Sequence, residues 1–206
     1  GIDHYGLVRD FYYPFVGHAN HVSGASGNYV HRIGVYVDGR LSWLDDGSWH
    51  VSVGCDEDTA IGGMVATHHS LGITLTSRDA VHNEENVFVR NITVTNERDQ
   101  SRVVKVFFSQ QFRISESRRG DTGLYDPRVG AIVHYKGHVT FLVNAFHGDQ
   151  QFTDYNIGLF GIEGRQGTYL DATDGILERN PIEHGSVDSV IGLDCDLMGN
   201  TSTEVR

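Results

Sequence analysis

The sequence is poor in cysteine, which cross-links small folds through disulfides, and in lysine, which helps to bind nucleic acid. Its 206 residues include only two cysteines and three prolines, and the formal net charge is −11. The cysteines, Cys55 and Cys195, are too few and too far apart for a disulfide framework. Lys105 and Lys136 are the only lysines, whereas phosphate binding depends on clustered basic side chains. We therefore expect neither a disulfide-rich scaffold nor a nucleic-acid partner.

Long apolar runs are also missing. None approaches the roughly 20 residues of a membrane-spanning helix, so no membrane partner is expected. The first residues, Gly1, Ile2, Asp3 and His4, do not resemble a secretory signal peptide, which predicts a cytoplasmic protein. They also lack an initiator methionine, so we expect that the chain was processed or belongs to something longer. The length suits a single domain.

Helical periodicity is absent as well, and the local signals are those of β-strands. The clearest is a hairpin in which residues 33–37 and 40–44 flank Asp38-Gly39. Asp-Gly favours a type I′ turn, because that turn needs positive φ at both central residues. The sequence therefore predicts two antiparallel strands joined by a tight turn.

Two further hairpins are predicted, one joining residues 87–95 to 102–109 and one joining residues 131–135 to 138–145. Shorter or isolated strands are expected at residues 50–53, 64–67, 72–76, 157–160 and 191–197. The prediction is thus an all-β protein, a large antiparallel β-sandwich that forms one domain over residues 1–206.

Motifs for metal or nucleophilic chemistry are not found. His18 and His21 are three apart and His68 and His69 are adjacent, but no second pair stands at zinc spacing. A Gly-x-Ser-x-Gly nucleophile elbow is also missing. We expect no metal and no other cofactor.

Paired carboxylates remain a possible source of chemistry. Glycoside hydrolysis needs two carboxylates about 5–10 Å apart that face each other across a sugar. Asp171 and Asp174 could form such a pair, but 27 acidic residues in this chain make chance pairs common. A small enzyme that uses these two residues is therefore one of three hypotheses.

Aromatic side chains offer a second candidate site. Tyr13, Trp43 and Trp49 could stack on sugar rings if their faces are exposed. The alternative is that these large rings lie in the core or in an interface, which is the usual place for them.

Several stretches of the chain together resemble one family. They are FYYPFVGHANH (11–21), HRIGV (31–35), SWL (42–44), LYDP (124–127), IVHYK (132–136), GTYLDATDG (167–175), NPI (180–182) and HGSVDS (184–189). In this order they are similar to the N-terminal region of prokaryotic glycoside hydrolase family 15 proteins. That family includes glucoamylases, glucodextranases and some trehalases.

The resemblance implies a glucoamylase-type super-β-sandwich that precedes an (α/α)₆ catalytic barrel. In the family the barrel carries the catalytic glutamates, and nothing in this chain resembles it. The resemblance therefore implies no catalytic residue here, an inactive chain, and a partner in the catalytic domain of the same α-glucosidase. The alternative is a carbohydrate-binding module that holds α-glucan through Tyr13, Trp43 or Trp49.

Two structural expectations follow from the resemblance. A domain separated from its partner should expose an apolar patch, near residues 12–16 or 167–189. In the family, the strand at residues 191–197 is followed by a short polar turn and a further strand that contains Trp. Because this chain ends at Arg206, within the expected turn, we expect that closing strand to be missing.

Overall fold

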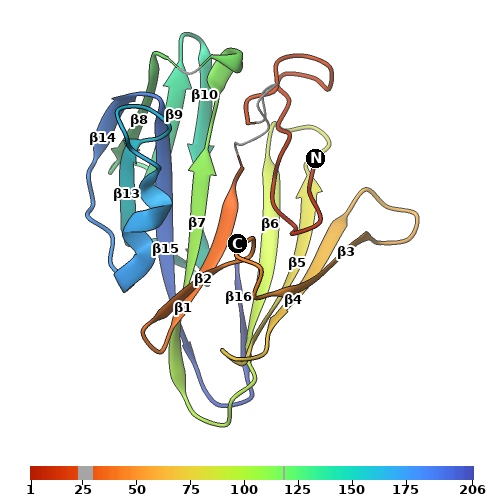
Figure 1. The fold of residues 1–206 in the computed structure, drawn as a ribbon. Coiled ribbons are helices and arrows are strands. Elements are labelled where there is room, and N and C mark those ends of the chain that lie inside the picture. Colours follow the sequence, from red (N-terminus) through yellow and green to blue (C-terminus); the bar gives the residue numbers. More distant parts are fainter. Residues whose placement is uncertain (23–29, 118) are drawn as a thin grey trace.

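The computed structural model describes residues 1–22, 30–117 and 119–206. Over these residues the chain forms three antiparallel sheets that pack into a β-sandwich, with the strands β3 to β6 facing β7 and β15 (Figure 1). The predicted fold class is confirmed.

The three sheets are as follows. The five-stranded sheet has the order β13 (Asp154–Leu159), β15 (Val187–Leu197), β7 (Arg102–Gln111), β1 (Arg32–Val37), β2 (Arg40–Trp43). The seven-stranded sheet has the order β12 (Gln150–Gln151), β11 (Phe146–His147), β16 (Ser202–Val205), β6 (Phe88–Asn96), β5 (Ile73–Val81), β4 (Gly62–His68), β3 (His50–Cys55). The four-stranded sheet has the order β10 (Val139–Val143), β9 (Ala131–Lys136), β8 (Asp121–Asp126), β14 (Ile182–Gly185).

The main core lies between the five-stranded and seven-stranded sheets. Alternate residues of β7 and β15, such as Val104, Val106 and Leu193, point into it because side chains alternate across a strand. They share one buried cluster with Leu75 and Val94 of the opposite sheet. The alternation of apolar residues along these strands therefore determines which face of the sheet is buried in the core.

The opposite face of the five-stranded sheet is covered by a short 3₁₀ helix, η2 (Thr168–Asp174). A second 3₁₀ segment, η1 (Ile114–Glu116), follows β7. Under η2 lies a small buried cluster of Trp43, Phe107, Ala172, Leu177 and Val190. In the parts of the chain that the structure describes, no helix has the length and apolar character needed to cross a bilayer.

The first predicted hairpin is confirmed. Gly34 to Val37 of β1 pair with Arg40 to Trp43 of β2. Asp38 and Gly39 have φ values of 52° and 75°, the positive values that a type I′ turn requires. The third hairpin also forms, as β9 and β10, with its turn one residue later than predicted.

The second predicted hairpin is wrong. β6 and β7 both form, but β6 pairs with β5 and β16, whereas β7 pairs with β1 and β15. The connection therefore crosses from one layer to the other. Ile92 and Val94 face the same core as Val104 and Val106, so the two strands stack by their apolar faces. An alternating pattern of apolar residues is compatible both with two strands paired in one sheet and with two strands packed face to face in different sheets.

The expectation that the chain ends within the turn after β15 is wrong. Ser202 to Val205 form β16, which pairs with β6 along four residues and meets β11 at Val205. The backbone of Arg206 exchanges two hydrogen bonds with Phe146. The end of the described chain is therefore part of the seven-stranded sheet.

Candidate functional site

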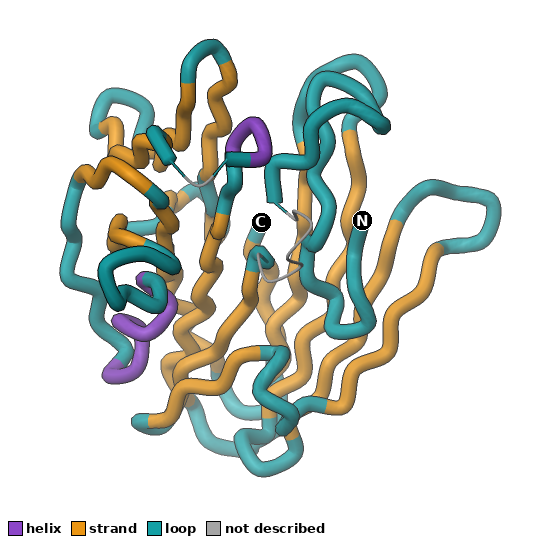
Figure 2. Tube along the Cα trace, turned by 45° about the horizontal axis from the view of Figure 1, so that its top comes forward, coloured by secondary structure: helices purple, strands orange, loops and turns teal. Residues whose placement is uncertain are grey.

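The most distinctive surface feature is a loop at residues 11–21, which we call the aromatic loop. Its two ends are held together by hydrogen bonds from the His21 N–H to the Phe11 carbonyl, at 2.8 Å, and from the Tyr13 N–H to the Ala19 carbonyl, at 3.4 Å. Asn20 accepts the backbone N–H of Phe11 through its side-chain oxygen, at 3.1 Å. Figure 2 shows the N-terminal loops at the end of the sandwich, beside η1.

A separate hydrophobic cluster lies beneath the aromatic loop. Val22, Phe112, Ile114 and Phe141 form it, and Phe11 packs against it. The rings of Phe112 and Phe141 are stacked with centroids 4.8 Å apart, and Phe11 meets Phe141 edge to face at 5.5 Å. The loop is thus built on a core of its own and is not a loose strand connection.

His21 fixes the loop to η1. Its Nδ1 accepts the backbone N–H of Ser115 at 3.1 Å, and its Nε2 lies 3.4 Å from the carbonyl oxygen of Tyr13. Because Nδ1 must be the acceptor, the proton is on Nε2, which donates to Tyr13. Burial lowers the pKa of His21, although the hydrogen bond to Tyr13 and the charge of Glu116 oppose that shift. The neutral ring therefore bridges two backbone segments.

The outer part of the loop is apolar and exposed. Tyr12, Tyr13, Phe15 and Val16, together called the apolar tip, have exposed fractions of 39, 36, 68 and 88%. Residues 11–22 include no Asp, Glu, Lys or Arg, although 21% of the whole chain is charged. An uncharged apolar group held on a well-anchored loop has the character of an interaction surface. Exposed apolar side chains thus lie at residues 12–16, one of the two expected locations of the patch.

The other expected location of the patch, residues 167–189, has fewer exposed apolar side chains. Leu170, Ile176 and Ile182 are exposed within residues 167–189. Six charged residues are interspersed in the same stretch: Asp171, Asp174, Glu178, Arg179, Glu183 and the buried Asp188. This surface is therefore of mixed character, unlike the apolar tip.

Two of the three predicted sugar-stacking residues lie in the core. Trp43 and Trp49 are 9 and 7% exposed, so the expectation that their rings are open to solvent is wrong. Trp43 packs over Gly34, where an added Cβ would lie 2.6 Å from the ring. The indole N–H of Trp49 donates to Ser42 Oγ at 2.8 Å. Of the three, Tyr13 alone presents an exposed ring.

The predicted carboxylate pair serves local structure. Asp171 Oδ2 accepts the Asn156 amide and the Glu178 backbone N–H, both at 2.8 Å. Asp174 Oδ1 accepts the backbone N–H of Ile176 at 3.0 Å. Burial raises the pKa of Asp171, while the two hydrogen bonds oppose the shift. These contacts hold η2 and the segment after it on the sheet.

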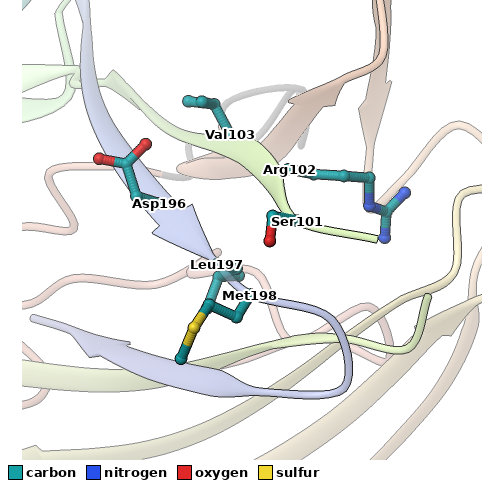
Figure 3. A pocket seen from close by; sticks show the side chains of 6 residues that line it. All are labelled: Ser101, Arg102, Val103, Asp196, Leu197 and Met198. Atoms are coloured by element: carbon teal, nitrogen blue, oxygen red, sulfur yellow. The ribbon is translucent and has the colours of Figure 1, made fainter. Parts of the chain in front are cut away.

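One shallow hollow of about 220 Å³ lies where β7 begins and β15 ends (Figure 3). It contains a single carboxylate, so it lacks the acid pair that glycoside hydrolysis needs. Its lining is Ser101, Arg102, Val103, Asp196, Leu197 and Met198.

A second hollow of about 340 Å³ is polar and is formed by turns. It includes Asp38 and Asp99 together with Arg40, Arg98 and Arg102. Arg102 is paired with Asp38 at 3.1 Å, so this acid already has a cationic partner. The chemistry of the hollow is that of ion pairing.

Metal-binding and thiol chemistry find little support in the described residues. Over residues 1–22, 30–117 and 119–206, no three His, Cys, Asp or Glu side chains come together in a way that could hold a metal ion. Both cysteines are free, Cys55 exposed and Cys195 buried. Burial raises the pKa of the Cys195 thiol to about 12, so it stays protonated.

The role of His21 was missed at the level of sequence. The three-residue spacing of His18 and His21 is a pattern typical of metal ligands, and it carries no sign of a bridge between backbone segments. The partners of His21 are backbone atoms, one of them in a segment more than 90 residues away. Any residue type could supply those atoms, so no sequence signal could have indicated the contact.

The known proteins to which this chain is similar are named as a glycosyl hydrolase and a glucoamylase. No protein-family model matches it. An uncharacterized glycosyl hydrolase of Methanocaldococcus jannaschii is 27% identical over 184 residues, which cover 89% of this chain and 28% of that protein. A crystal structure of a bacterial glucoamylase complexed with acarbose matches with a TM-score of 0.68 and 12% identity, over 98% of this chain and 28% of that chain.

The chain is therefore related in sequence to a glycosyl hydrolase, and it has a glucoamylase-like β-sandwich fold. It spans little more than a quarter of the length of either protein.

Proposed function

We propose that residues 1–206 are the non-catalytic N-terminal domain of a family 15 glycoside hydrolase. The parent enzyme is a glucoamylase-like α-glucosidase that acts on α-glucans, and this domain packs on the (α/α)₆ catalytic domain and stabilises it. The proposal rests on how much of each matched protein this chain covers. Nearly all of this chain matches only 28% of a glycosyl hydrolase and 28% of a glucoamylase.

The site chemistry supports a non-catalytic role. The first hollow described above offers one carboxylate, and in the second Asp38 is already paired with Arg102. The carboxylates of Asp171 and Asp174 are engaged by amide groups that fix η2. A sandwich fold hosts many functions, so the fold alone does not support this role and the chemistry of the site is needed beside it.

The test is an assay of glucose release by the 206-residue chain from maltose, dextrin, isomaltose and trehalose. A commercial glucoamylase provides the positive control. We expect no release above the rate without protein. Hydrolysis that co-purifies with the chain and is lost in Asp171→Asn or Asp174→Asn would show instead a small enzyme built on that pair.

The alternative is a carbohydrate-binding module. It now depends on Tyr13 and on Tyr12, the residue before it in the sequence, because both side chains are exposed. Calorimetric titration with soluble starch and dextran tests it. Heat of binding that is lost in Tyr13→Ala would favour the module. A flat titration at millimolar sugar would leave the packing role.

A further inference from the structure

We propose that the apolar tip of the aromatic loop, Tyr12, Tyr13, Phe15 and Val16, is the surface that contacts the catalytic domain of the same polypeptide. This inference rests on the proposed function and adds to it the site of contact. It concerns an apolar surface that is exposed in the structure over residues 1–22, 30–117 and 119–206.

The first argument is the manner of presentation. The tip is held by backbone hydrogen bonds across the loop, by the cluster under Phe11, and by the bridge from His21 to Ser115. Ordering a surface before it binds lowers the entropic cost of association. A large apolar group that is both exposed and well anchored is therefore suited to a permanent contact.

The second argument is charge. The buried centre of a protein interface is depleted in charged residues and enriched in aromatic ones. Residues 11–22 fit this composition, since they include no Asp, Glu, Lys or Arg. The stretch around Leu170 and Ile176 fits it less well, because acidic residues are interspersed there. Charge thus favours the apolar tip over the other exposed group.

The third argument concerns what covers the tip. Each of the two matched proteins has more than two thirds of its length outside the region that corresponds to this chain. In the proposed parent enzyme that remainder includes the catalytic domain, which is joined to this domain covalently. A tethered partner is present at high effective concentration, so a small apolar contact suffices to dock it.

The experiment is hydroxyl-radical footprinting, read by mass spectrometry, on two proteins. One is the 206-residue chain, and the other is the complete product of the gene that encodes it. We expect oxidation of Tyr12, Tyr13 and Phe15 to fall by about fivefold or more in the complete product, as for residues buried in an interface. Tyr135 on β9 is the matched reference, because it is 38% exposed and lies outside the loop.

The outcomes separate this inference from the proposed function. If the tip stays reactive while Leu170, Ile176 and Ile182 become protected, the contact site is wrong and the packing role stands. If no residue becomes protected, both the contact and the packing role are overturned. A complete gene product without a catalytic domain overturns the proposed function itself, and the inference with it.

A variant gives an independent reading. Phe15→Ser with Val16→Ser in the complete product changes two exposed side chains, so the sandwich itself should fold. We expect faster proteolysis at the junction of the domains and a shorter half-life of hydrolytic activity on heating. Val65→Ser with Val89→Ser, on the outer face of the seven-stranded sheet, is the control. Equal behaviour of the two variants would contradict the inference.

Discussion

Both carboxylate oxygens of Asp188 accept the backbone N–H of Thr168, at distances of 2.8 and 3.1 Å. This contact ties the start of η2 to β15 inside the protein, where Asp188 has no exposed surface. Burial raises the pKa of Asp188 to about 7, against the lowering effect of its hydrogen bonds. A buried carboxyl group thus holds the segment that covers one face of the five-stranded sheet.

The first prediction is that Asp188→Asn destabilises the protein more at low pH than at high pH. A folded-state pKa above the unfolded value means that the contribution of the carboxyl is full below about pH 3.8 and is lost as the pH rises through about 7. The asparagine has no such dependence. Urea unfolding between pH 4.5 and 8 should show the two proteins converging as the pH rises. A constant difference would contradict the assignment.

The second prediction concerns His134, whose Nε2 lies 2.8 Å from Ser189 Oγ in the interior. Burial lowers the pKa of His134 to about 3, so its proton uptake below pH 6.5 accompanies unfolding. Stability is therefore lost as the pH falls from 6.5 toward 3. His134→Gln should remove about 1.4 kcal/mol of this dependence for each pH unit.

Urea unfolding at several pH values checks this result. His138→Gln, which changes an exposed residue in the adjacent turn, is the matched control. If both variants keep the wild-type slope, the buried imidazole is not the group responsible.

The third prediction separates the core aromatics from the exposed one. Trp43→Ala should lower the free energy of unfolding by about 3–5 kcal/mol, because it opens a cavity over Gly34 beside Phe107. Tyr13→Ala should cost roughly 1 kcal/mol or less, since much of its ring is already exposed. Chemical denaturation measures both values. A stability loss as large for Tyr13→Ala as for Trp43→Ala would mean that the loop is part of the core.

The fourth prediction is that His21→Ala loosens the aromatic loop. The variant removes the acceptor of the Ser115 N–H and the donor to the Tyr13 carbonyl. Hydrogen exchange at residues 12–20 should accelerate, while the strands of the five-stranded sheet keep their protection. His18→Ala, in the same loop but with an exposed ring, is the control. Unchanged exchange in the His21 variant would show that the bridge does not hold the loop.

Much of the strand content could be predicted from the sequence, because alternation and turn chemistry are local. Asp38-Gly39 determines its own turn, and residues 191–197 show which side of β15 is buried. The pairing of β6 and β7 could not be predicted, since it depends on how Ile92 and Val94 meet the opposite layer. The same pattern would serve either arrangement.

The candidate site could be predicted only in part. The sequence predicts an exposed apolar patch at residues 12–16 or 167–189, and the apolar tip lies in the first of these ranges. The sequence leaves open whether Trp43 is exposed or buried, because its burial depends on the absence of a Cβ at Gly34 on the neighbouring strand. Contacts between residues distant in sequence, such as His21 with Ser115, decide which side chains remain accessible.

The packing role is tested most directly by the thermal inactivation of the complete gene product, with and without residues 1–206. Glucose release from maltose after timed heating is the measurement. We expect the truncated product to lose its activity with a clearly shorter half-life, because the surface of its catalytic domain that the apolar tip covers is then exposed to solvent. Equal half-lives would contradict a stabilising role for residues 1–206. Glucose release by residues 1–206 alone would contradict a non-catalytic role.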